Sequence, residues 1–219
     1  MKLLLEREDV NPNMPNGHGQ TPLLWAVENG HEGVVELLLR RQDVNPNMPH
    51  NCCQAPLLWA AENGHEGMAR LLLRREDVDP DIRDNGGLTP LSWAAAWGHA
   101  GVVKLLLGRE DVNPDMSDHR CRTALSWAAA GGHDGVVELL LEHEDVNPGI
   151  PDINGRSPLS WATAGGRPGV VKLLSGREDP RSSMSRNGGL GPPPSASNGR
   201  NIEGVELLQP TRSTNSNLA

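Results

Sequence analysis

The sequence predicts an all-α solenoid of stacked helical repeats, because several residue types recur at a fixed spacing of 34 residues. The recurring tryptophans are Trp25, Trp59, Trp93, Trp127 and Trp161. A glycine follows each of them by five residues, and a proline precedes four of them by three. A fixed period of about 20 to 50 residues indicates a stacked array rather than one globular core.

The stretch from 19 to 52 shows the two helices expected in every unit. Thr21 can cap a helix that starts at Pro22, because a threonine hydroxyl accepts backbone N–H groups and proline suits the first turn. Gly30 is expected to end this helix, since glycine adopts the left-handed conformation at little cost. A second helix follows from Glu32, with valines and leucines on a broad apolar stripe.

An extended finger loop is expected after the second helix, where the segment QDVNPNMPHNC is rich in asparagine and proline. Each unit then consists of two short antiparallel helices and a long polar loop. A tetratricopeptide array has the same period, but it is helical through nearly its whole length. The proline-containing third of each unit argues against that alternative.

The stretch TPLSWAAAWGHAGVVKLLL resembles the ankyrin repeat signature of Thr-Pro-Leu-His, a small-residue pair, Gly-His and a Val/Leu helix. The form LSWAA with REDVNPN is similar to ankyrin arrays common in filamentous fungi, and the resemblance covers about residues 1–179. The unit departs from the family period of about 33 residues. The signature histidine, which ties neighbouring loops together in the family, is replaced in every unit, by Leu24, Leu58, Ser92, Ser126 and Ser160. This loss predicts weaker coupling between repeats.

The register also predicts the domain organisation. A partial repeat over 1–18 supplies only a second helix and a finger, and Pro192, Pro193 and Pro194 interrupt the last unit, whose first helix is not expected to form normally. The complete predicted order is 1–18, then repeats over 19–52, 53–86, 87–120, 121–154 and 155–188, an eroded sixth repeat over 189–208 and a disordered tail over 209–219.

The five recurring tryptophans are expected to be structural. They stand where the ankyrin pattern usually has a core leucine, and a buried tryptophan removes about 150 Å² or more from water. We therefore expect Trp25, Trp59, Trp93, Trp127 and Trp161 to form an internal column.

Composition and motifs give no support for catalysis, metal binding or nucleic-acid binding. The formal net charge is −8, and no run of Lys or Arg exceeds a pair, whereas a phosphate-backbone binder needs a basic patch. Cys52, Cys53 and Cys121 are too few for a disulfide framework, and no second pair stands at zinc-site spacing. The histidines at 31, 65, 99 and 133 recur once per unit and lack the second His of a zinc-protease motif. No cofactor, metal or catalytic residue is expected.

The chain has no apolar stretch long enough for a membrane span and no signal peptide pattern. We therefore expect a soluble monomer in the cytoplasm, with entry into the nucleus through a partner as an open alternative.

Candidate partner-binding residues are those that differ between units where the resemblance places the concave, partner-holding face. Trp97 is the one tryptophan that does not follow the 34-residue spacing. It is either a binding hot spot or a side chain folded over a neighbouring helix end. The full set of candidates is Trp97, Glu28, Asn29, Glu62, Asn63, His50, Arg83, His119 and Arg120.

These observations predict a non-catalytic scaffold that binds a protein partner. Two alternatives remain open from the sequence. One is a transcriptional co-regulator that acts through protein contacts. The other is a fragment of a larger repeat protein without a separate function.

Overall fold

The structure is a computed structural model and describes residues 10–49 and 54–176. Some predictions fall outside these residues. They concern the segment 1–9 of the partial repeat, His50, Cys52, Cys53, the end of the fifth repeat, the eroded repeat and the tail.

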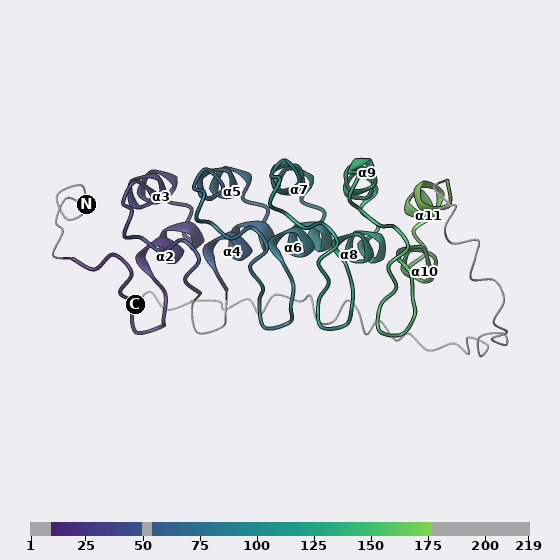
Figure 1. The fold of residues 1–219 in the computed structure, drawn as a ribbon, viewed down its shortest axis with the longest axis horizontal. Coiled ribbons are helices and arrows are strands. Elements are labelled where there is room, and N and C mark those ends of the chain that lie inside the picture. Colours follow the sequence, from purple (N-terminus) through teal and green to yellow (C-terminus); the bar gives the residue numbers. More distant parts are fainter. Residues whose placement is uncertain (1–9, 50–53, 177–219) are drawn as a thin grey trace, which may run out of the picture. The chain divides into compact units, whose positions relative to one another are not determined.

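Ten helices lie in the described residues and form five pairs, joined by loops without any extended strand in these ranges (Figure 1). The helices are α2 (Pro22–Glu28), α3 (Glu32–Leu39), α4 (Pro56–Glu62), α5 (Glu66–Leu72), α6 (Pro90–Trp97), α7 (Ala100–Leu107), α8 (Ala124–Gly131), α9 (Asp134–Glu142), α10 (Pro158–Ala164) and α11 (Pro168–Ser175). The predicted all-α solenoid is confirmed.

The helices stack in two rows. The first helices of the units (α2, α4, α6, α8, α10) form one row and the second helices form the other, while the finger loops extend beyond the first row (Figure 1). Each helix packs on its partner and on the equivalent helix of the next unit. One continuous apolar core results, in which Leu23, Leu57, Leu91 and Leu125 are each 1% exposed.

The predicted helix ends are also confirmed. The hydroxyls of Thr21, Thr89 and Thr123 accept a hydrogen bond from the backbone N–H three residues later, which Ala55 cannot do. The turn between the paired helices holds a glycine with positive φ in every unit, for example 72° at Gly30 and 75° at Gly98.

The predicted internal column of tryptophans is wrong. Trp25 is 44% exposed, Trp127 is 5% exposed, and the other three are half-buried. The helix geometry explains this. With about 100° between successive residues, Leu23, Ala26 and Val27 share the side that faces the core, and Trp25 lies on the opposite side.

Other side chains provide the coupling that the missing signature histidine would have supplied. Arg75 donates from Nη1 to the backbone oxygens of Leu39 and Arg41 in the preceding unit, at 3.3 and 2.8 Å. His99 Nε2 lies 3.0 Å from the oxygen of Glu62. Equivalent bonds recur one unit later from Arg109 and His133. The orphan carbonyls at helix ends are thus satisfied by the next unit.

Candidate functional site

The candidate site is the surface formed by the outward side of the first helices and the adjoining fingers, called here the first-helix face. Its common feature is one tryptophan per unit, and the surroundings of that tryptophan change along the stack.

In the first two units the tryptophan contacts a histidine from the turn. The Trp25 and His31 ring centroids are 5.4 Å apart, and those of Trp59 and His65 are 5.0 Å apart and stacked. Beside them, a finger glutamine donates to the glutamate that ends the helix, Gln20 to Glu28 and Gln54 to Glu62. Burial raises the pKa of Glu62, with the hydrogen bond from Gln54 acting in the opposite direction.

The third unit uses a carboxylate instead. Trp93 donates from Nε1 to Asp84 Oδ2 at 2.9 Å, while the other Asp84 oxygen accepts from the backbone N–H groups of Gly86 and Leu88. Leu88 occupies the finger position that holds glutamine in the first two units. It cannot compete for the carboxylate, which therefore remains available to the indole.

In the last two units an arginine occupies that finger position and covers the tryptophan. The guanidinium of Arg122 lies 3.8 Å from the Trp127 ring centroid, and that of Arg156 lies 3.8 Å from the ring centroid of Trp161. The Nε atoms of these arginines bind Asp118 and Asp152 at 2.8 and 2.9 Å. The carboxylate is thus taken by arginine, and both indole N–H groups are buried without an acceptor among the described residues.

The electrostatic surroundings act in opposite directions on the charged forms of Arg122 and Asp152, one charged group from each of the two pairs. Burial lowers the pKa of Arg122, although the charge of Asp118 acts against that change. For Asp152, burial acts to raise the pKa, but the backbone N–H groups of Arg156 and Asn154 and the Arg156 side chain keep it below its ordinary value. Sequence reasoning missed these pairs. A signal was present, because Asp and Arg precede the tryptophan by nine and five residues in both units.

Trp97 lies half-buried at the end of α6, and its Nε1 is buried without a hydrogen-bond partner in the described part of the chain. No ring contact or hydrogen bond there joins it to the predicted finger residues. Both interpretations of Trp97 therefore stay open.

The other predicted binding residues already make contacts within the fold. Asn29 and Asn63 donate from their side chains to the backbone oxygens of Trp25 and Trp59, at 2.8 and 2.9 Å. Their amides cap helix ends, and the rest of each side chain is exposed.

The predicted finger residues join one finger to the next. Arg83 Nη2 lies 3.1 Å from the sulfur of Met116, and His119 donates its backbone N–H to the oxygen of Gly86 at 3.1 Å. The oxygen of Arg120 accepts from Ile153 at 2.9 Å. Their side chains are nevertheless exposed, so the fingers offer polar groups on a connected backbone.

Neither a metal-binding cluster nor a membrane-spanning helix lies in the described residues. There, no group of three or more His, Cys, Asp or Glu side chains is arranged to hold a metal ion. None of the described helices is long and apolar enough to cross a membrane.

Comparison with known proteins identifies the class. A profile described as ankyrin repeats (3 copies) matches residues 42–118 and 110–183, and one described as ankyrin repeat matches 18–51. The chain belongs to the ankyrin repeat family. Among solved structures, the chain is similar to the crystal structure of EF0377, an ankyrin repeat protein. The two share 27% identity with a TM-score of 0.74, over 80% of this chain and 89% of that one.

No curated protein matches the chain significantly. Matches extend to 502 chains of solved structures, so the fold is too widely shared to select a partner by itself. Ankyrin repeats generally mediate protein–protein interactions, and any finer assignment depends on the first-helix face.

Proposed function

We propose that the chain is a non-catalytic scaffold that binds a protein partner along the first-helix face, with Trp97 at the centre of the contact. The observation that carries the proposal is the row of tryptophans on this face. Trp25 is exposed, and Trp59, Trp93, Trp97 and Trp161 are half-buried. Aromatic side chains of this kind are enriched at the energetic centres of protein interfaces.

The polar groups around this row would provide orientation. Glu28 and Glu62 lie beside the first two tryptophans, and Arg156 covers the last one with its side chain 46% exposed. A partner segment with basic groups toward the first units and acidic groups toward the last would be complementary to this order. Arg83, His119 and Arg120 would supply further contacts from the fingers, together with Asn29 and Asn63.

The proposal also includes the finer predictions from the sequence. The protein would be a cytoplasmic monomer that binds neither nucleic acid nor membranes directly. Its repeats would have the predicted boundaries and resemble those of filamentous-fungal arrays. No observation favours the co-regulator or the fragment alternative over the scaffold. Microscopy of the tagged full-length protein tests the co-regulator, which strict exclusion from nuclei would eliminate.

The experiment that tests the scaffold is partner capture by crosslinking from the source cells, followed by titration of the purified partner. Trp97→Ala is expected to weaken binding by at least ~30-fold, the effect of losing about 2 kcal/mol at a hot spot. Glu138→Ala is the matched control, because Glu138 is exposed on α9 in the row of second helices. Equal affinity of the Trp97→Ala protein and the wild type, with helical content unchanged, would reject Trp97 as the centre.

A further inference from the structure

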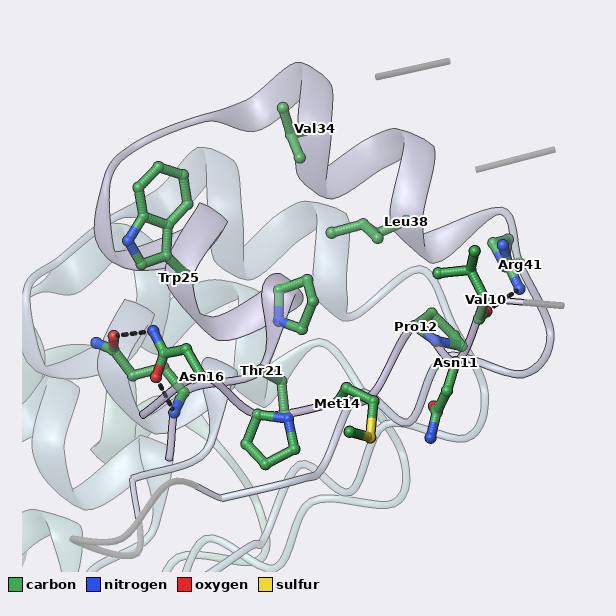
Figure 2. Close-up of a pocket in the computed structure, with 13 residues that line it drawn as sticks. Val10, Asn11, Pro12, Met14, Asn16, Thr21, Trp25, Val34, Leu38 and Arg41 are labelled. Atoms are coloured by element: carbon green, nitrogen blue, oxygen red, sulfur yellow. Dashed lines mark hydrogen bonds between the residues drawn. The ribbon is translucent and has the colours of Figure 1, made fainter. Parts of the chain in front are cut away.

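The end of the stack that precedes α2 carries an apolar groove of about 410 Å³. Figure 2 shows Trp25 from α2, Val34 and Leu38 from α3, and Val10, Pro12 and Met14 from the preceding finger around this space. Arg41 is the charged residue among those that line it.

Comparison with later units shows that this groove is a packing surface. Pro22 is exposed, whereas the residues 34, 68, 102 and 136 positions further on (Pro56, Pro90, Ala124 and Pro158) are buried. Val34 is partly exposed, whereas Met68, Val102, Val136 and Val170 are at most 3% exposed. In the later units, the helices of the preceding unit cover these positions.

An arginine that recurs in successive units gives an independent indication of which segment occupies the groove. Arg75 and Arg109 each donate to backbone oxygens 36 and 34 residues earlier, at the end of the preceding second helix. Arg41 stands at the same position of its unit, and its side chain is 13% exposed, close to the 12% of Arg75. Residues 36 and 34 positions before Arg41 are Leu5 and Arg7.

We propose that residues 1–9 of this chain dock in the groove as the second helix of a half unit. Leu4 would lie against Val34 and Leu38, and Arg41 would cap the backbone oxygens of Leu5 and Arg7. The segment MKLLLERED is long enough and runs directly into Val10, which lines the groove. Its leucines at 3, 4 and 5 stand 34 residues before Leu37, Leu38 and Leu39, the corresponding part of α3.

A second copy of the chain fits the groove less well. A copy stacked end to end would present the opposite face of the stack, where Ser160 and Thr163 are exposed and Ser175 replaces the leucine of earlier units. These hydroxyl groups already bond within their own segments, to the Ser157 hydroxyl and to the oxygens of Leu159 and Val171. Contact with the apolar groove would remove their remaining water and give them no further polar partner. The chain's own leucines carry no such penalty.

The test is hydrogen–deuterium exchange of the full-length protein. Leu4→Asp places a charge at a position whose equivalents at 38, 72, 106 and 140 are buried. It is expected to speed exchange in α2 and α3 by about tenfold or more, while exchange in α8 stays unchanged. Lys2→Glu is the matched control. It lies in the same segment at the position of exposed Glu36, and it should leave exchange in α2 and α3 unchanged.

Arg41→Gln is a second variant that keeps the leucines and removes the proposed cap, and it is expected to speed exchange in α3 as well. Because it also removes the bonds of Arg41 to Asp43 and to the oxygen of Val10, the Leu4→Asp protein decides the test. Unchanged exchange in α2 and α3 of the Leu4→Asp protein would overturn the proposal. Protection of wild-type α2 that falls on tenfold dilution would also overturn it, because the occupant would then be a second copy.

Discussion

The first two units and the fourth and fifth units use the same tryptophan position in opposite ways. In the first two, the ring contacts a histidine of the turn, and Trp25 remains 44% exposed. In the fourth, Arg122 lies over the ring, and Trp127 is 5% exposed. The finger position that holds glutamine in the first two units holds arginine in the fourth and fifth, where an Asp–Arg pair covers the ring.

This difference divides the first-helix face into a part suited to binding a partner and a part that mainly stabilises the fold. An exposed ring beside a glutamate can contact a partner without first displacing a neighbour. A ring covered by a paired arginine must lose that contact before it can bind. We therefore expect the first three units to contribute more to binding and the last two to contribute more to stability.

The largest expected effect is from Trp127→Ala. The variant removes a buried ring and its contact with Arg122, so we expect a loss of about 3–5 kcal/mol in the free energy of unfolding. Trp25→Ala should cost only about 1 kcal/mol, because the ring is already largely in water. Urea unfolding followed by circular dichroism measures both values. Equal losses would contradict the distinction between the two halves.

The turn glycines give the next effect. Gly98 has a φ of 75°, and a Cβ there would lie 2.5 Å from Nδ1 of the His133 ring. Gly98→Ala is thus expected to cost about 2–3 kcal/mol, from backbone strain and displacement of His133.

Gly30→Ala is the matched control for that prediction. Its φ is 72°, but a Cβ would meet no atom within 4 Å. Only the backbone strain of about 1–2 kcal/mol remains. If both variants lose the same stability, the contact between His133 and the turn contributes nothing to coupling.

Much of the fold was predictable because its signals are local. The Thr-Pro helix starts and the glycine stops each depend on residues within one unit, and the 34-residue period follows from comparing units; the structure confirms all three. The burial of the tryptophans was predicted wrongly because they lie on the side of the helix away from the core, where burial depends on what the finger before the helix places over the ring. Arg122 and Arg156 stand at a fixed spacing from Trp127 and Trp161, but arginine occupies this position in only two of the five units and so is not part of the periodic pattern.

The smallest expected effect concerns a row of Asn and Asp side chains that bond to the backbone of the next finger. The residue type in this row also changes between the early and middle units. Asn47 donates from Nδ2 to the oxygen of Asp77 at 2.7 Å, and its Oδ1 accepts from the N–H of Asp79 at 2.9 Å. Asp81 stands 34 residues later and keeps only the second bond, to Asn113 at 2.9 Å. Its Oδ1 is buried without a partner in the described residues, because a carboxylate cannot donate to a carbonyl.

Burial raises the pKa of Asp81, and the nearby charges of Asp79 and Asp111 raise it further, against a lowering by the N–H of Asn113 and by Arg83. Since the folded-state pKa is raised, the stability linked to this proton is present at low pH and is lost as pH rises through that pKa. Asp81→Asn is therefore expected to stabilise the fold by about 1 kcal/mol at pH 7, by restoring the missing donor. The gain should shrink at pH 4, where the wild-type carboxyl can donate the same bond.

Thermal unfolding at both pH values measures this gain, with Glu138→Gln as a control that removes an exposed charge on α9. The reverse change, Asn47→Asp, should lower stability at pH 7 by about 1–2 kcal/mol and less at pH 4. A gain from Asp81→Asn that is the same at both pH values would show that the carboxyl's proton has no part in this row of bonds. The difference between the early and middle units would then be one of packing alone.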